Sequence, residues 1–496
     1  MNVKRRQAKV LTIIFAVVML ICILPGCSQQ PSTTLQLNTW SDDVKTAVND
    51  FVTLYGNTSK LYDKESYVVF DFDNTTCIFD IQDQALVYQL ENMNFAKDPD
   101  SFDKILRAEL DGNFDDWITD IITAYDYLYK TYGPFTAKGL DEQTREAVLE
   151  DPMWGEFASK MLIISSDAAN YRDNWKIRWF SGMTEQEIYD ITYASCSKYS
   201  KMETENQTIE GPLSLTSLVG PKSVTVTNGL AVTDNTVELW KVLDENGIDV
   251  WVCSASEINQ VRAAVDCLGL RDYCTGVTAK TMKFDNNGLM LPEYDFETGK
   301  GWLCKEDGVW EKDIYNAKGS CREEGKVITI NNAIAPHYGN KGPLAGFMDS
   351  TGDFNFCTEY DSLKLVICFN RANQKITDGG GLIAEIAMYE KDNLKYNLKK
   401  ANDAGDTYYV LQGRDDNNLR GFRNSNSTLT LGETEGKLFR NEDNYAQLQY
   451  ITDKNMSIED AINTFAIKTS ENESDNVLGL KYGFLTEYSG YHAIAK

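Results

Sequence analysis

Histidine is almost absent from this sequence, which has only two histidines among its 496 residues. There is also no CxxC pair and no cluster of Cys with His, so a structural zinc site is not expected. Basic residues are scarce relative to acidic ones, with 48 Lys and Arg against 74 Asp and Glu and a formal net charge of −26. Such a surface repels phosphate backbones, so we expect no nucleic-acid partner.

The apolar run near the N-terminus, LTIIFAVVMLICIL, is shorter than the ~20 residues that a membrane-spanning helix needs. It lies between the basic segment MNVKRRQAKV and the sequence LPGCS, an order that is typical of a signal peptide. The ending Leu-x-Gly-Cys resembles the lipobox of bacterial lipoproteins, which implies removal of residues 1–26 and acylation of Cys27. We therefore expect an extracytoplasmic protein that a lipid anchors to the bacterial cell membrane. An uncleaved N-terminal anchor is the alternative.

The rest of the chain divides into segments of different pattern. Residues 61–80 and 226–378 alternate strand-like apolar runs with helical runs, which predicts an α/β fold with a Rossmann-like parallel sheet as its core. Residues 81–225 are aromatic and mainly helical, so we expect a helical cap inserted into that core. Residues 27–60 are expected to form a tether and a leading helix, and residues 379–496 a C-terminal extension of unknown role.

Polar residues follow three of the apolar runs directly. The run YVVF is followed by Asp71 and Asp73, and the run VWVC by Ser254. The run LAGFM is followed by Asp349, with Asp353 four residues later. Because ligands of a parallel sheet bind outside the carboxyl ends of its strands, we expect these side chains to meet.

The residue types predict phosphoryl chemistry. Asp71, Asp349 and Asp353 offer the hard oxygen ligands that suit Mg²⁺, an ion that bridges to substrate phosphate. A carboxylate can also attack phosphorus, while a second one two residues later protonates the leaving oxygen. Ser254 and Lys326, which begins a predicted helix in EEGKVITINNAI, would hold phosphoryl oxygens. No histidine is needed for this chemistry.

These four motifs resemble those of the haloacid dehalogenase superfamily. DFDNT is similar to its DxDxT first motif, VWVCSAS to the second, GKVITI to the third and FMDSTGD to the fourth. The resemblance implies that Asp71 is the nucleophile and a Mg²⁺ ligand, and that Asp73 is the acid/base and binds the metal through its backbone carbonyl. Asp349, supported by Asp353, would complete the metal site, and the second and third motifs would bind phosphate. An Asp at the second position of the pair favours phosphatase activity over dehalogenase activity.

One branch, the phosphorylcholine phosphatases, resembles more of the sequence. The segments FDFDNTTCIFDIQDQAL, WFSGMTEQEI, LDENGIDVWVCSASEINQVRAAV and GKVITINNAI carry this resemblance. In that branch an acidic pair after the first motif helps to bind the trimethylammonium group, and the corresponding positions here read Gln82 and Asp83. Since cationic groups are recognised by carboxylates and aromatic faces, the predicted substrate contacts are Asp83, Gln82 and, in the cap, Trp117.

The sequence thus predicts a Mg²⁺-dependent phosphomonoester hydrolase whose substrate is a small phosphorylated alcohol, phosphocholine or phosphoethanolamine. A phosphoserine phosphatase or a broad-specificity acid phosphatase would use the same catalytic residues without the choline contacts. A function of another class is a binding lipoprotein that captures choline-like cations without turnover. Lys341, eight residues before Asp349, is the alternative to Lys326 as the third-motif lysine.

Overall fold

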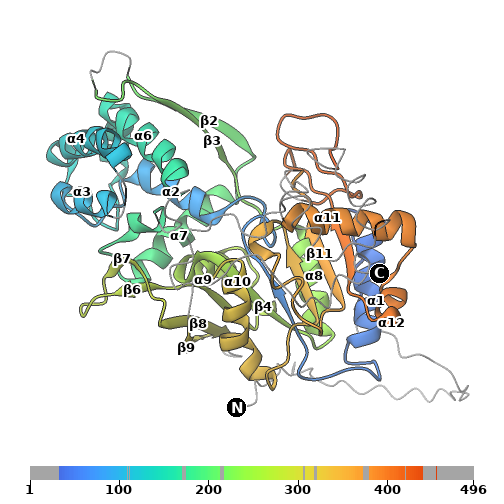
Figure 1. The fold of residues 1–496 in the computed structure, drawn as a ribbon. Helices are drawn as coiled ribbons and strands as arrows, with labels where there is room; N and C mark the ends of the chain where they lie inside the picture. Colours follow the sequence, from blue (N-terminus) through green and yellow to red (C-terminus); the bar gives the residue numbers. More distant parts are fainter. Residues whose placement is uncertain are drawn as a thin grey trace, which may run out of the picture.

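An eight-stranded sheet organises the computed structural model (Figure 1), which describes residues 33–438 and 454 except 109, 111, 170–174, 213–216, 305–307, 318–320, 373–378 and 419–420. In the order in which they neighbour one another, its strands are β12 (Tyr408–Gln412), β11 (Leu365–Phe369), β10 (Ala345–Met348), β1 (Tyr67–Phe70), β4 (Asp249–Glu257), β5 (Gly276–Lys280), β8 (Thr298–Cys304) and β9 (Trp310–Asn316).

The strands from β12 to β5 are all parallel, while β8 and β9 extend the sheet in antiparallel pairing. Helices cover the parallel part, so the predicted α/β class with a Rossmann-like core is confirmed. The outermost parallel strand, β12, comes from beyond residue 378. The predicted C-terminal extension therefore contributes a strand to the core sheet, and its short apolar run was not visible as a further βα unit because the surrounding sequence lacks clear periodicity.

The order in which the chain adds strands changes side at β1, in the middle of the parallel part of the sheet. After β1 the chain forms β4 and β5 on one side, and it later returns to form β10, β11 and β12 on the other. Phe70 at the end of β1 pairs with Phe347 of β10, so the residues that follow these two strands emerge side by side. A reversal of this kind opens a crevice at the carboxyl ends of the strands, which is where open α/β sheets bind ligands.

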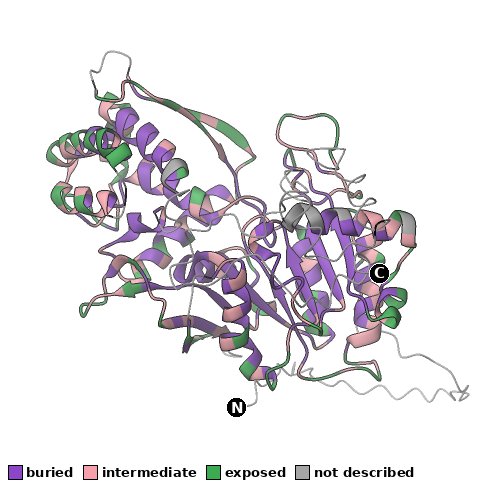
Figure 2. Cartoon of the chain, in the orientation of Figure 1, coloured by how far each residue is buried: buried purple, intermediate pink, exposed green. Residues whose placement is uncertain are grey.

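Both faces of the sheet are covered, which explains the unbroken apolar run of β1. Val68 and Phe70 pack with one cluster of core residues, whereas Tyr67 and Val69 pack with a second cluster on the opposite face. The first cluster includes the helices α1 (Asp42–Tyr55), α8 (Asp234–Glu245), α9 (Ile258–Cys267) and α12 (Leu398–Ala404). The second includes α10 (Glu324–Thr329) and α11 (Gly379–Tyr389). Figure 2 shows the strands between these layers as buried.

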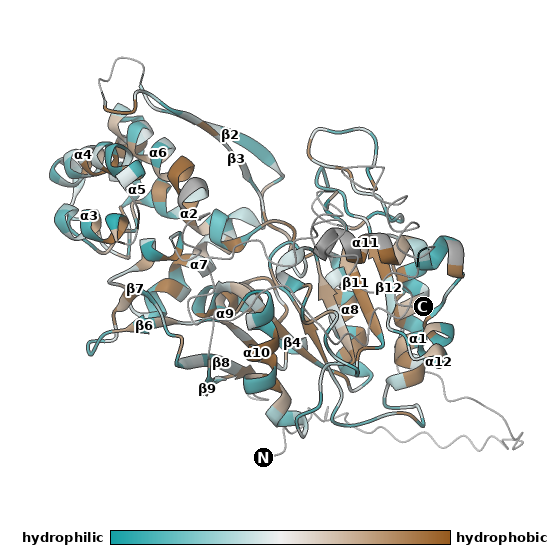
Figure 3. Cartoon of the chain, in the orientation of Figure 1, coloured by the Kyte–Doolittle hydropathy of each residue, from teal (hydrophilic) through white to brown (hydrophobic). Residues whose placement is uncertain are grey.

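A group of helices separates β1 from β4 in the sequence. It consists of α2 (Ile81–Asn92), α3 (Pro99–Arg107), α4 (Asp115–Tyr132), α5 (Glu142–Glu150), α6 (Pro152–Ala169) and α7 (Glu185–Tyr199), followed by the hairpin of β2 (Glu205–Glu210) and β3 (Ser223–Asn228). Figure 1 places α3, α4 and α6 at one end of the molecule, away from β11 and β12. In Figure 3 the outer faces of α3 and α4 are largely hydrophilic, while the central strands are hydrophobic.

The second hairpin, of β6 (Met282–Phe284) and β7 (Met290–Tyr294), joins this helical group to the core. Its Met290 exchanges backbone hydrogen bonds with Gly182 and Met183, both at 2.8 Å. The hairpin belongs to the stretch between β5 and β8, whereas the helical group belongs to the stretch between β1 and β4. The segment inserted after β5 therefore supports the segment inserted after β1.

No helix within the described part of the chain is both long and apolar enough to cross a membrane. The predicted signal peptide, residues 1–26, and the predicted acylation site Cys27 lie outside the described residues. Both stay predictions.

We expect Phe70→Ala to lower the free energy of unfolding by about 3–5 kcal/mol, the usual cost of truncating a buried Phe. The Phe70 ring is fully buried and stacks on Phe347 with the ring centroids 3.7 Å apart. Urea unfolding followed by tryptophan fluorescence measures the change. Leu61→Ala is the control, since that side chain is 62% exposed and should stay within about 0.5 kcal/mol of the wild type. Equal effects of the two substitutions would contradict the prediction.

Candidate active site

The turn after β1 presents the first pair of carboxylates. Asn74 adopts a left-handed backbone (φ 60°), which Asn tolerates better than most residues, and its N–H donates to the carbonyl of Phe79 at 3.1 Å. The Thr76 hydroxyl donates to the carbonyl of Asp71 at 2.6 Å. These local bonds close the DFDNT segment into a loop, so that Asp71 and Asp73 both line the cavity that opens at the end of β1.

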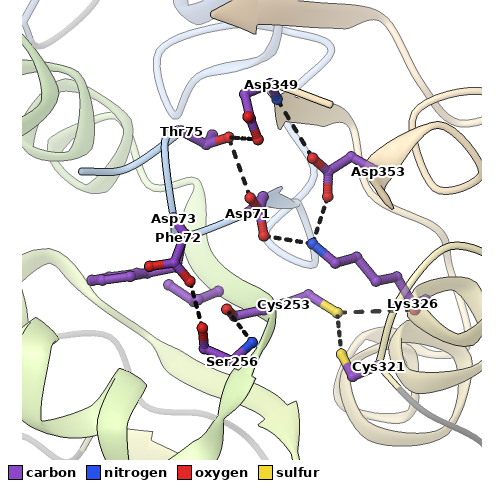
Figure 4. A network of polar contacts seen from close by, with 12 residues as sticks. Asp71, Phe72, Asp73, Thr75, Cys253, Ser256, Cys321, Lys326, Asp349 and Asp353 are labelled. Atoms are coloured by element: carbon purple, nitrogen blue, oxygen red, sulfur yellow. Dashed lines mark hydrogen bonds and ion pairs between the residues drawn. The ribbon is translucent and has the colours of Figure 1, made fainter. Parts of the chain in front are cut away.

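Lys326 joins two of the predicted carboxylates (Figure 4). Its Nζ lies 2.5 Å from Asp71 Oδ1 and 2.5 Å from Asp353 Oδ1, and all three side chains are buried. Burial alone would lower the pKa of Lys326, but the carboxylates of Asp353 and Asp71 outweigh it and raise this pKa well above its ordinary value. Lys326 therefore lines the cavity between two carboxylates that favour its charged form.

Three of the carboxylates lie close enough together to hold a metal ion. Oxygens of Asp71, Asp349 and Asp353 all lie within 4.8 Å of one another. The Thr75 hydroxyl lies between two of them, 3.4 Å from Asp71 Oδ2 and 3.2 Å from Asp349 Oδ1. Burial raises the pKa values of Asp71 and Asp353, which means that their shared negative charge is costly in this protein environment. A divalent cation would offset that cost, and an all-oxygen donor set suits Mg²⁺.

Asp73 lies beside this cluster and differs from it in its hydrogen bonds. Its Oδ1 accepts from the Ile81 N–H at 2.7 Å, and its Oδ2 accepts from the Ser256 hydroxyl at 2.5 Å. Burial, together with the neighbouring Asp80, raises the pKa of Asp73 well above its ordinary value. A carboxyl group of raised pKa that is held in place by two donors is equipped to give a proton to a leaving group.

The structure places Ser254, the predicted phosphate ligand, behind the cavity wall. Ser254 is fully buried and its hydroxyl accepts from the Ser256 N–H at 3.1 Å, whereas Ala255 and Ser256 line the cavity. Ser256 is thus a site residue that the sequence reasoning did not select. The sequence could have indicated Ser256, because it follows Ser254 by two residues at the end of the same strand, β4.

The cavity has a volume of about 460 Å³, and five of the described side chains that line it are cationic. They are Lys176, Lys280, Arg322, Lys326 and Arg371. Only Lys326 was predicted. Arg371 lies two residues after the end of β11, so the argument from strand ends could have found it, and its Nη1 donates to Asp349 Oδ2 at 2.7 Å. Lys176 carries no such signal, since it comes from the segment between α6 and α7.

The predicted substrate contacts are separated in the structure. Gln82 lines the cavity. Asp83, the next residue in the sequence, is instead ion-paired with Lys176, with 2.6 Å between Asp83 Oδ1 and Lys176 Nζ. Trp117 lies in α4, where the Lys222 ammonium sits 5.0 Å from the centre of its ring, and it does not line this cavity. Lys341, the alternative third-motif lysine, pairs with surface acids instead.

No protein-family model matches the chain, and no curated protein matches it. Among solved structures, a conserved protein of unknown function from Anaerococcus prevotii DSM 20548 has a TM-score of 0.62 and 26% sequence identity, over 80% of this chain and 98% of that chain. A cytosolic 5'-nucleotidase IIIB bound to cytidine has a TM-score of 0.26 and 16% identity, over 68% of this chain and 80% of that chain. The first likeness supports the fold, and the second is too weak to carry an argument.

We expect Mg²⁺ to raise the melting temperature of the protein and EDTA to reverse the rise, because a ligand that binds only the folded state stabilises it. The gain is about 2.7 kcal/mol at a free concentration one hundred times the Kd. Asp349→Asn should remove most of the effect. Asp126→Asn is the matched control, since Asp126 is a surface carboxylate paired with Lys130. A thermal-shift titration measures both. A shift of the same size in both variants would place the metal elsewhere.

Proposed function

We propose that the protein is a metal-dependent phosphomonoester hydrolase in which Asp71 attacks phosphorus. The observation that carries this proposal is the cluster of Asp71, Lys326, Asp349 and Asp353. It lies at the carboxyl end of β1, where the strand order changes side. The neighbouring Asp73, with its raised pKa, supplies the proton chemistry that ester cleavage requires.

The first step forms a bond between Asp71 and phosphorus. A carboxylate oxygen of Asp71 attacks as the bond from phosphorus to the ester oxygen breaks, and Asp73 gives its proton to that departing oxygen. Lys326 lies within reach of Asp71 Oδ1, so its charge stabilises the negative charge that spreads over the phosphoryl oxygens. A divalent cation held by Asp71, Asp349 and Asp353 would add to this stabilisation when bound.

The second step regenerates Asp71. Water attacks the phosphorus of the aspartyl-phosphate, Asp73 accepts a proton from that water, and the bond between Asp71 and phosphorus breaks. The products are inorganic phosphate and the free carboxylate of Asp71. Ser256 holds Asp73 through its hydrogen bond of 2.5 Å, which keeps the acid/base group oriented in both steps.

We expect Asp71→Asn to reduce the release of phosphate by about a thousandfold or more, the scale on which loss of a nucleophile is felt. Phosphate release is measured with Mg²⁺ and with EDTA, on p-nitrophenyl phosphate, phosphocholine, phosphoethanolamine and phosphoserine. Circular dichroism of the variant checks its fold.

Two outcomes would overturn the mechanism. Full activity of Asp71→Asn would assign the attack to another group. A folded wild-type protein that releases phosphate from none of the four esters, yet binds choline in a calorimeter, would favour the alternative of a binding lipoprotein.

The specificity for the leaving group depends on Lys176. We propose that this lysine occupies the place that a substrate cation would need beside Asp83, so that phosphocholine and phosphoethanolamine are the less favoured substrates. Burial opposes the charge of Lys176, but Asp83 and Asp80 outweigh burial and raise its pKa. No aromatic side chain lines the cavity within the described residues, so a trimethylammonium group would find no aromatic face there. Asp80 also lines the cavity, and its charge, like that of Asp83, already acts on Lys176.

We expect Lys176→Met to raise kcat/KM for phosphocholine relative to p-nitrophenyl phosphate by about tenfold, because a repelling charge is removed and Asp83 becomes available to the substrate cation. Steady-state kinetics on the two esters gives the ratio. Lys283→Met is the control, since Lys283 pairs with the exposed Glu293 outside the cavity. An unchanged ratio in Lys176→Met would contradict the role assigned to Lys176. A selective loss of phosphocholine turnover in Asp83→Ala would support the choline specificity predicted from the sequence.

A further inference from the structure

A second cavity, with a volume of about 390 Å³, adjoins the candidate active site. It shares two wall residues, Asn74 and Arg371, with the first cavity. Four of its other wall residues come from the C-terminal extension, to which the sequence assigned no role: Arg414, Asp416, Thr430 and Lys437.

The topology of the sheet brings two arginines to this place. Arg371 lies two residues after the end of β11 and Arg414 two residues after the end of β12, its parallel neighbour. Gly413, between β12 and Arg414, passes so close to the chain that a Cβ there would lie 2.0 Å from the Ser427 carbonyl oxygen. Only glycine fits at this crossing, which fixes the backbone from which Arg414 extends.

Arg414 is buried and ion-paired with Asp416, which also lines the second cavity. The residue is 3% exposed, and its hydrogen bonds to Asn74 and to Asp416 are all long, at 3.4 Å. Its Nε lies 2.8 Å from Asp416 Oδ1 but lacks the alignment of a hydrogen bond. A guanidinium has five N–H donors, so this one retains donor capacity at the wall of the second cavity.

The charge around the shared wall favours an anion once a metal is bound. The second cavity is lined by three cationic side chains, Arg371, Arg414 and Lys437, and by the carboxylate Asp416, so its wall is net positive. A divalent cation held by Asp71, Asp349 and Asp353, which already contact Lys326 and Arg371, would add to this positive charge. Arg371 also repels Arg414, although the attraction of Asp416 for Arg414 is larger, and an anion between the two arginines would relieve this repulsion. Lys437, another wall residue, pairs with Glu433 four residues earlier. Because this ion pair is partly exposed, it contributes little to stability, and Lys437 can leave Glu433 to contact a bound anion.

We propose that this second cavity binds an anionic group, a phosphate or a carboxylate, carried by the leaving group of the substrate. The proposal rests on the hydrolase function proposed above and narrows its substrate class to phosphomonoesters that bear a second anionic group. Asn74 and Arg371 form the border between the two subsites, with Arg414 and Lys437 as the residues that determine specificity in the second.

Two matched pairs of substrates test the proposal: 3-phosphoglycerate against glycerol 3-phosphate, and fructose 1,6-bisphosphate against fructose 6-phosphate. We expect the wild type to favour the member with the second anion by about tenfold or more in kcat/KM. Arg414→Met should bring this ratio close to one, with Arg414→Lys retaining part of it. Lys437→Met, at a more exposed position, should reduce the ratio without risk to the fold. Lys399→Met, an exposed lysine of the extension paired with Asp403, should leave it unchanged.

Binding of inorganic phosphate separates a failure of this proposal from a failure of the hydrolase function. Calorimetry on the Asp71→Asn protein with Mg²⁺ should detect two phosphate sites, and the double variant with Arg414→Met should lose one. Two sites without any hydrolysis would reject the hydrolase and keep the second anion site. Hydrolysis without preference in either pair, together with one phosphate site, would overturn the second site alone. Two sites without a substrate preference would show that the cavity takes a free anion, and would overturn its assignment to the leaving group.

Discussion

Three carboxylates held together away from water impose the constraint to which the rest of this structure responds. Their oxygens lie within 4.8 Å of one another, and two unit charges 4 Å apart repel by about 4 kcal/mol at an effective dielectric constant of 20. Lys326 contacts Asp71 and Asp353, and Arg371 contacts Asp349, so the protein itself offsets part of this repulsion. The negative charge that remains would be offset by a bound cation, which is the basis on which we propose a metal site here.

The sheet makes such a concentration of charge possible. A carboxylate cluster inside a hydrophobic core would have to be protonated or excluded, since an unpaired buried charge is very costly. Here the apolar side chains of β1 and β10 are buried on both faces of the sheet, and the charges begin only where the strands end. The reversal of strand order at β1 then leaves the crevice in which these charges meet. The parallel arrangement of the strands therefore also brings the carboxylates together.

Much of this arrangement could be predicted from the sequence because strands and strand ends have local signatures. The runs YVVF and LAGFM are buried strands, and the argument from strand ends brought together Asp71, Asp73, Asp349 and Asp353. The same argument located β4 but selected Ser254, whereas Ser256 is the serine that lines the cavity, because the twist and the end of the strand determine which hydroxyl faces it. It also missed β12, whose single apolar run stands in a sequence without further periodic signal.

Side chains that approach the site from distant segments could not be predicted in this way. Trp117 was selected because the cap is rich in aromatic residues. Amino-acid composition does not determine where a side chain points, and the Trp117 ring contacts Lys222. Lys176 comes from a connection between helices, and only the tertiary structure places it against Asp83. Long-range ion pairs of this kind leave no periodic trace in the sequence.

Substrate specificity depends on the side chains that reach the site from distant segments of the chain. The four motifs carry the groups to which we assign the reaction, and they belong to the core strands and to α10. The residues that would contact a leaving group come from elsewhere, Lys176 from the helical group and Arg414 from the segment after β12. Both are cations, and both face a site that a bound metal would make more positive. A cationic alcohol would have to displace Lys176 from Asp83 to bind, whereas an anionic leaving group would find donor groups already in place. The balance of charge therefore favours an anionic leaving group, even though the motifs themselves resemble those of enzymes that act on a cationic one.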